Sequence, residues 1–271
     1  MKPSTKIGIA ASAGVIALVA AMHAALPALS RKFGGAETGL DSFEGRVVTA
    51  FAENPEEAKK GAVAADDFSE AFVRRWEKSR GANLPTSSVK LYLFPNQAAF
   101  SRHGLVRMSN ALEFNGGYFS AAEGAIALVA GDDAGLRHEL THMLASASWG
   151  PGAELSTWFS EGLAQWHESG VEGGPGTGEA NARDLLAAGR WLSLPDLLDS
   201  SGEAFKKAGN DVYYAQSASL FAWLATVRPA ALERVVALER LPGKVSMGEF
   251  EEAVGEKAET IEADWRAWAR K

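Results

Sequence analysis

The sequence predicts an α+β protein in which a small mixed sheet carries a metal-binding helix and is followed by a mainly helical C-terminal part. Three observations lead to this prediction. Strand-like apolar segments gather in the first half of the chain, helical patterns fill the second half, and two histidines at helical spacing lie where these halves meet. At 271 residues, the chain is long enough to bury one sizeable core.

The first elements follow from glycine content and apolar spacing. The polar, glycine-containing stretch 31–45 predicts a linker. Apolar residues across 46–85 recur at helical spacing, apart from a break at Asn54-Pro55, and predict a helical N-terminal segment. Val89–Phe94 is a short apolar run that ends at a proline, and it predicts a strand.

Two more strands are expected just before the histidine motif. Gly116–Phe119 and Ala125–Ala130 predict paired strands, and a helix over 135–147 then carries the histidines. A second helix is expected to begin at Ser156 or Thr157, and 171–178 is a glycine-rich surface loop. Further helices are predicted to begin near residues 180, 195, 211, 230 and 246. Residues 86–271 would together form the main domain.

Residues 1–30 have the pattern of an export signal. Lys2 and Lys6 form a positively charged start, and Ile7–Leu29 is apolar apart from one histidine. The run is long enough to span a bilayer, while small residues before Ser30 suit signal cleavage after it. A cleaved signal peptide and a retained membrane tether through residues 7–29 both place the globular part outside the cytoplasm.

Composition excludes several classes of function. A net charge of −7 with no cluster of lysine and arginine argues against nucleic acid or an anionic lipid surface as a partner. The chain has no cysteine, so a disulfide framework, a thiol nucleophile and a cysteine-bound metal are all excluded. Any metal site is left to histidines and carboxylates.

The pentapeptide His138-Glu139-Leu140-Thr141-His142 carries most of the chemistry. Two imidazoles at i and i+4 lie one turn apart on the same helix face, so their ring nitrogens can converge on one cation. Glu139 lies beside that face, where a carboxylate can act as a general base on water held by the metal. The alternative is a pair of core histidines, but the chain holds only five His in all and two stand at ligand spacing.

Glu161 is the expected third ligand. It lies in Trp158-Phe159-Ser160-Glu161-Gly162-Leu163-Ala164, with eighteen residues between His142 and Glu161. Two imidazoles and one carboxylate suit Zn²⁺ and leave a fourth position open, which is the catalytic rather than the structural arrangement. The alternative is a solvated glutamate, although the small residues Gly162 and Ala164 favour close helix packing here.

The remaining acidic and histidine residues near these motifs receive lesser roles. His167 falls on another helical face than Glu161 and is expected at the surface or beside the ligands, not among them. Asp132, Asp133 and Glu154 are expected to cap helices or hold a ligand histidine. Glu123 fits a hairpin connection, with capture of a substrate amine as the alternative.

These motifs resemble those of a known family. The His-Glu-x-x-His motif followed by Glu-Gly-x-Ala resembles the gluzincin, or peptidase MA-like, zinc metallopeptidases, and the gap before Glu161 matches their aminopeptidase branch. The segment Tyr213–Leu224 is similar to the Tyr-Ala-Gln-x-x-x-Leu helix of small exported bacterial domains of unassigned substrate. The resemblance runs from Val89 to about Trp268, which is roughly two thirds of the chain.

The resemblance implies a zincin-like fold and two further features of the site. A tyrosine before Ala215-Gln216 would donate a hydrogen bond to the developing oxyanion, which favours Tyr214 and leaves Tyr213 as the alternative. The strand Ala125–Ala130 would be a sheet edge that pairs with an extended peptide substrate. An ordinary core strand is the alternative for that segment.

The sequence therefore predicts an exported zinc metallopeptidase that acts on peptides or proteins. In this prediction His138, His142 and Glu161 hold Zn²⁺, Glu139 is the base and Tyr214 polarises the carbonyl. Endopeptidase and aminopeptidase activity both remain open. A second hypothesis is a non-catalytic envelope protein that keeps the zinc-containing fold as a binding or scaffold module.

Overall fold

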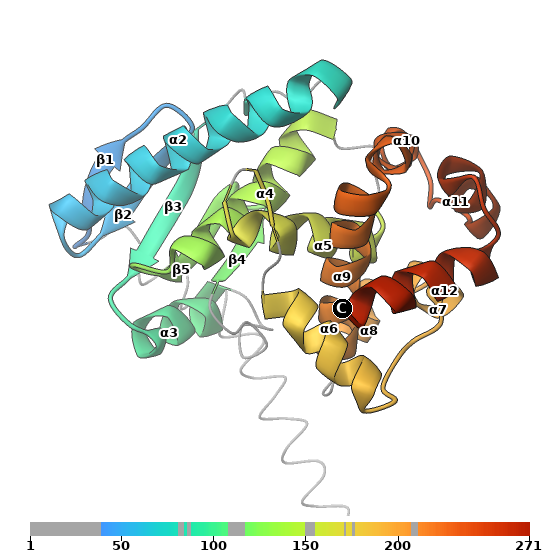
Figure 1. Ribbon diagram of the computed structural model, residues 1–271. Coiled ribbons are helices and arrows are strands. Elements are labelled where there is room, and N and C mark those ends of the chain that lie inside the picture. Colours follow the sequence, from blue (N-terminus) through green and yellow to red (C-terminus); the bar gives the residue numbers. More distant parts are fainter. Residues whose placement is uncertain are drawn as a thin grey trace, which may run out of the picture.

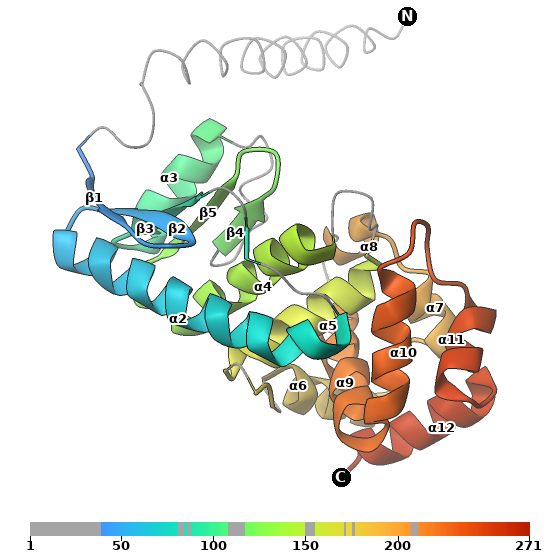
Figure 2. The same cartoon turned by 90° about the horizontal axis from the view of Figure 1, so that it is seen from above.

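The computed structural model describes residues 39–80, 84–85, 88–107, 117–149, 155–170, 172–174, 177–206 and 211–271. The predicted export signal, residues 1–30, lies outside these ranges. A mixed sheet with helices α2 and α3 occupies one end of the molecule, and helices α10 to α12 occupy the other (Figures 1 and 2). The α+β class predicted from the sequence is confirmed.

The sheet has five strands in the order β1-β2-β3-β5-β4. Strands β2, β3 and β5 are parallel, and the two outer strands run antiparallel to their neighbours. The strands are β1 (Asp41–Glu44), β2 (Val48–Ala52), β3 (Val89–Phe94), β4 (Gly117–Ser120) and β5 (Ala125–Val129). The predicted mixed sheet and the paired strands before the metal helix are both confirmed.

The N-terminal region is where the predicted secondary structure is wrong. Val48–Ala52 is a strand rather than part of a helix, and helix α2 (Pro55–Arg80) begins only after it. Every second residue of this strand, Val48, Ala50 and Ala52, is buried, which is the period of two typical of a strand. Over only five residues, this period cannot be distinguished from helical spacing. The expected linker is also partly a strand, because β1 pairs with β2 through Asp41–Glu44.

Helices cover both faces of the sheet. On one face α2 and α4 (Asp133–Trp149) pack against Val48, Leu91 and Ile126. On the other face α3 (Gln97–Arg107) places Phe100 against Tyr92 and Tyr118. Because β2 pairs with β3 and α2 packs on the same sheet, the segment 46–85 shares its core with the rest of the chain.

The C-terminal part is helical, as predicted. Its helices are α5 (Thr157–Glu168), α6 (Thr177–Ala187), α7 (Leu194–Leu198), α8 (Gly202–Lys206), α9 (Asp211–Val227), α10 (Pro229–Glu239), α11 (Met247–Val254) and α12 (Ala258–Ala269). Helix α5 lies between α4 and α9. None of the helices in the described ranges is long and apolar enough to cross a membrane.

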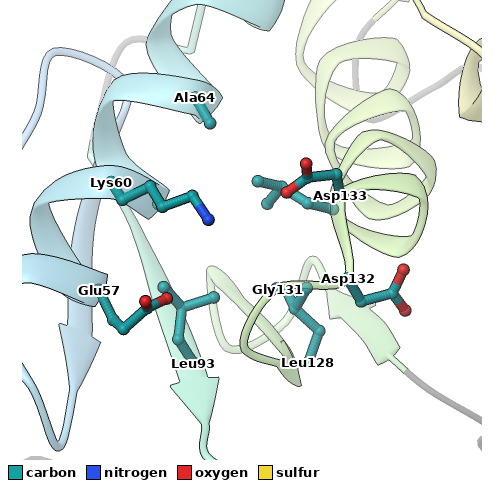
Figure 3. Close-up of a pocket in the computed structure, with 10 residues that line it drawn as sticks. Glu57, Lys60, Ala64, Leu93, Leu128, Gly131, Asp132 and Asp133 are labelled. Carbon is teal, nitrogen blue, oxygen red and sulfur yellow. The ribbon is translucent and has the colours of Figure 1, made fainter.

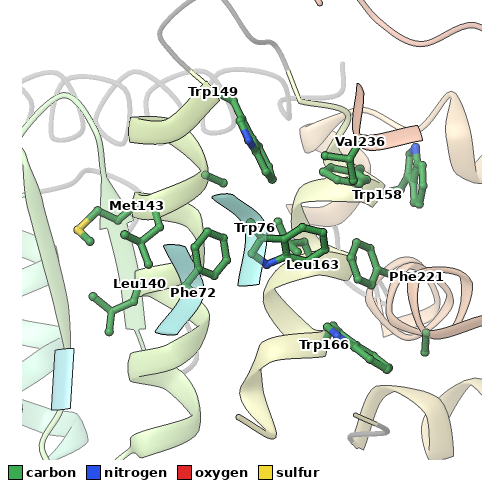
Figure 4. Packing of buried hydrophobic residues seen from close by; sticks show 14 of the residues in the cluster. Phe72, Trp76, Leu140, Met143, Trp149, Trp158, Leu163, Trp166, Phe221 and Val236 are labelled. Atoms are coloured by element: carbon green, nitrogen blue, oxygen red, sulfur yellow. The ribbon is translucent and has the colours of Figure 1, made fainter. Parts of the chain in front are cut away.

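A cluster of aromatic and aliphatic side chains joins the sheet part to the C-terminal helices (Figure 4). Phe72 and Trp76 of α2 meet Leu163 and Trp166 of α5, and Phe221 of α9 continues the cluster. Burial of this apolar surface holds α5 in place between the two parts of the molecule.

The sheet edge beside the metal helix is not the strand that was expected. Ala125–Val129 pairs with β3 on one side and β4 on the other, so it is an inner strand. The edge strand is β4, Gly117–Ser120, and its outer side carries no strand among the described residues. The prediction that Ala125–Ala130 is the edge strand is therefore wrong. Whether a strand lies at an edge depends on the strands that pair with it, and β3, one of the two partners of β5, lies more than thirty residues earlier in the chain.

Candidate metal centre

Helix α4 presents its histidines opposite its buried face. The Asp132 side chain caps the helix by accepting the amide of Gly135 at 2.8 Å. A Cβ at Gly135 would lie 2.4 Å from Asp132 Oδ2, so glycine permits this tight cap. Leu140 and Leu144 are fully buried in the core. Asp132 is thus a cap, one of the two roles expected for it.

The three predicted ligands converge. Nε2 of His138 lies 3.1 Å from Nε2 of His142, and Glu161 Oε2 lies 3.5 and 3.8 Å from these nitrogens. The centre of such a triangle is about 2.0 Å from each donor, which matches the distances of about 2.0–2.2 Å that zinc makes with imidazole and carboxylate. Among the described residues, these form the group of three that could hold a metal ion.

Each imidazole is also held by its other nitrogen. Nδ1 of His138 makes a 2.8 Å hydrogen bond with Glu168 Oε1, and Nδ1 of His142 makes a 3.1 Å hydrogen bond with Ser160 Oγ. When both Nδ1 atoms donate, both Nε2 lone pairs point toward Glu161 and are available to a cation. The orientation of both rings is therefore held by α5, the helix that also carries Glu161.

Burial and neighbouring charges shift the pKa values of all three residues of the group. Burial lowers the pKa of His138, but hydrogen bonds with Glu161 and Glu168 outweigh it and raise the pKa well above its usual value. Burial lowers the pKa of His142 to about 4. Burial raises the pKa of Glu161, yet the two imidazoles outweigh that effect and the net pKa is lowered. The carboxylate thus stays ionised beside two nitrogen donors, which is the donor set a divalent cation requires.

Glu139 lies between α4 and the edge strand. Its side chain is only 9 % exposed, and a Cβ on Gly117 would lie 3.3 Å from Glu139 Cγ. Burial raises the pKa of Glu139 to about 7, although a hydrogen bond from the Phe119 backbone acts in the opposite direction. A carboxyl with a pKa near neutrality can both accept and release a proton at physiological pH.

Two adjacent tyrosines, Tyr213 and Tyr214, lie in the first turn of α9. Burial raises the pKa of Tyr214, and the charges of Glu161 and Glu139 raise it further. Tyr214 is tied to α5 because its backbone carbonyl accepts a 3.0 Å hydrogen bond from Gln165. Both tyrosines contact Phe205, with ring centroids 5.3 Å away for Tyr213 and 5.1 Å for Tyr214. The preference for Tyr214 over Tyr213 stays a prediction from the sequence.

The lesser candidates have structural roles. His167 is fully buried rather than at the surface, and its Nε2 accepts a 3.1 Å hydrogen bond from the Trp76 indole. Glu123 lies in the exposed turn between β4 and β5, where its amide donates to Ser120 Oγ at 3.3 Å. Asp133 is exposed at the start of α4, and Glu154 lies outside the described residues.

Sequence reasoning missed Glu168 and Ser160. Glu168 follows Glu161 by seven residues, two helical turns, so both carboxylates point from the same face of α5. Ser160 precedes Glu161 directly. The i, i+7 spacing of two glutamates was the signal in the sequence that could have identified Glu168.

A small cavity near the start of α4 is not a second site. It lies between α2 and α4 at the ends of β3 and β5, where Lys60 and Asp133 point toward it (Figure 3). Its volume is about 20 Å³, which is room for a single water. A peptide does not fit there.

Comparison with known proteins adds no identification. No protein-family model matches this chain, and a search of curated proteins finds no significant match.

Proposed function

We propose that this chain is a zinc-dependent metallopeptidase with a zincin-like fold, similar to the gluzincins. The observation that carries the proposal is the convergence of His138, His142 and Glu161 around one point, with Glu139 buried beside them. A mixed sheet whose antiparallel edge strand lies next to the histidine helix supports the same reading of the fold.

The donor set favours zinc. Three protein ligands, two imidazoles and one carboxylate, would leave a fourth position open, as in catalytic zinc sites. The chain has no cysteine that could act as a further ligand. When bound, zinc acts as a Lewis acid toward the substrate carbonyl and makes water more acidic.

The surrounding residues would perform the proton transfers. Glu139 would take a proton from the attacking water and deliver it to the leaving amine, a task suited to a carboxyl whose pKa is about 7. Tyr214 would donate a hydrogen bond to the carbonyl oxygen as negative charge develops there. Its raised pKa keeps the phenol protonated and able to donate.

The edge strand β4 would hold the substrate. Gly117 and Phe119 adjoin Glu139, so a peptide that pairs with the free side of β4 would place a backbone carbonyl close to the ligand group. Backbone pairing recognises an extended peptide of any sequence. The substrate class is therefore an extended segment of a peptide or unfolded protein, outside the cytoplasm if residues 1–30 act as an export signal or anchor.

Metal analysis with three variants tests this proposal. Purified protein should contain about one zinc per chain, since the described residues hold one such group of donors. His142→Ala should lose most of it, whereas Glu123→Gln, which changes an exposed turn carboxyl, should keep it. Glu139→Gln should keep zinc and lose cleavage of a peptide library. Zinc-free wild-type protein, or undiminished zinc in His142→Ala, would refute the metal centre.

The same experiment separates the peptidase from the scaffold hypothesis. A scaffold has no need of a buried carboxyl at position 139, so the presence of Glu139 counts against it. Zinc-loaded protein that cleaves no member of the library would favour the non-catalytic hypothesis, whereas cleavage that survives Glu139→Gln would refute the role of Glu139 as the base.

A further inference from the structure

Helix α5 makes three of the contacts that define the metal centre. It supplies the ligand Glu161, and its Ser160 and Glu168 hold Nδ1 of the two imidazoles on α4. The position of α5 relative to α4 therefore controls both the donor triangle and the orientation of the rings. The residue that fixes the end of α5 nearest His138 would tune metal affinity without touching the metal.

Arg137 holds that end. Its Nε and Nη2 donate to the backbone carbonyl of Glu168 at 2.8 and 2.5 Å. Glu168 is the last residue of α5, so its carbonyl is one of those left without a partner inside the helix. A guanidinium at this end also interacts favourably with the helix dipole.

Two adjacent residues of α4, Arg137 and His138, both bind Glu168. Arg137 binds the backbone of Glu168, and the next residue, His138, binds the side chain of the same Glu168. The Glu168 side chain is 27 % exposed and stands at a helix end, just before Gly170 with φ +139°. Such a terminal residue frays unless it is held from outside the helix.

We propose that Arg137 is a positioning residue for the metal centre, because it fixes the terminal residue of α5 so that Glu168 can orient His138. This inference rests on the proposed metal site. Arg137 touches none of the three ligand atoms, and its effect passes through Glu168 alone. Removal of a group that orients a ligand typically weakens metal affinity by about 10-fold to 100-fold.

Arg234 offers a matched control. Its Nε donates to the carbonyl of Ala253 at 2.6 Å, in the last turn of α11, and no hydrogen bond or ion pair joins its side chain to α4 or α5 within the described residues. Arg137→Met and Arg234→Met thus remove the same kind of bond from a helix end. Both should lower the melting temperature of metal-free protein to a similar extent.

The experiment measures zinc affinity by competition with a chromophoric chelator, beside melting curves of the metal-free proteins. Arg137→Met should weaken zinc binding by about 10-fold or more, and Arg234→Met by less than about twofold. Arg137→Lys keeps a cationic donor and should recover part of the affinity. In a Glu168→Ala background, Arg137→Met should cause no further loss, because the two residues act in one chain of contacts.

The following outcomes would contradict the inference. Equal zinc affinity in Arg137→Met and wild type, or equal losses in Arg137→Met and Arg234→Met, would show that Arg137 serves the fold only. If Arg137→Met does not fold, Glu168→Ala decides the question, because the effect of Arg137 passes through Glu168, and wild-type zinc affinity in Glu168→Ala would overturn the proposal. Wild-type protein that binds no zinc refutes the metal centre itself, which is a separate and distinguishable failure.

Discussion

The packing of α5 against α9 provides a sharp test of how the site is built. Gly162, next to the proposed ligand Glu161, lies where the backbones of the two helices are in close contact. A Cβ at this position would be 2.6 Å from the carbonyl oxygen of Ser217 and 3.0 Å from Cβ of Phe221. The substitution Gly162→Ala therefore adds one methyl group at the point of contact.

Two opposing effects decide the result of this substitution. Alanine favours the helix by about 1 kcal/mol relative to glycine. Overpacking of a filled interior costs about 1–3 kcal/mol, and the upper part of that range applies because the clash is with backbone of α9 rather than with a flexible side chain. The expected net loss of stability is about 1–2 kcal/mol, or about 2–8 °C in Tm for a chain of this size.

The same clash should also weaken zinc binding. Ordinary contact begins near 3.4 Å, so α5 must move by roughly 0.8 Å away from α9 and toward α4. That displacement changes the position of Glu161 relative to the two imidazoles. It therefore distorts the triangle formed by the two Nε2 atoms and Glu161 Oε2, whose sides are 3.1, 3.5 and 3.8 Å. Zinc affinity should therefore fall together with stability.

Gly248 provides the control. It lies in α11, is exposed, and an added Cβ would meet nothing within 4 Å. Gly248→Ala should stabilise the protein by up to about 1 kcal/mol and leave zinc affinity unchanged. Thermal melts of metal-free protein and chelator competition measure the two quantities. A Gly162→Ala protein as stable as wild type, or one that behaves like Gly248→Ala, would refute the argument from close packing.

Three further predictions concern catalysis, pH and location. Tyr214→Phe should reduce kcat by about 100-fold to 1000-fold with zinc content unchanged, whereas Tyr213→Phe should have little effect; the reverse order would assign the phenol to Tyr213. Burial raises the pKa of Glu239, so its contribution to stability is present at acidic pH and is lost as the pH rises from the usual carboxyl value through the raised one. Glu239→Gln should flatten that part of the pH–stability curve measured by denaturant titration, and an unchanged slope would contradict the assignment. Fractionation with N-terminal sequencing should find either a mature chain that begins near Arg31 or a membrane-bound chain with an intact N-terminus, and a full-length cytosolic product would contradict both.

The parts of the site that obey local rules could be predicted from the sequence. His138 and His142 share a helix face because their spacing is one turn, and this holds whatever surrounds the helix. The motif around Glu161 selected the residue that the structure places beside the two imidazoles. In contrast, β2 was assigned to a helix because its burial pattern is decided by pairing with β3, about forty residues along the chain. Strand order and the contact between Arg137 and Glu168 depend on such distant pairings, which no local pattern encodes.

The division of ligands between two helices has a thermodynamic consequence. Helix α4 is anchored to the sheet through Leu140 and Leu144, while α5 is anchored to the C-terminal helices through Phe159 and Trp166, whose rings both contact Phe221 of α9. A cation held by donors from both helices binds only when the two parts are docked, so its binding free energy adds to the stability of that interface. The site and the packing between the sheet and the helical part are therefore coupled, and each variant that loosens α5 should weaken both.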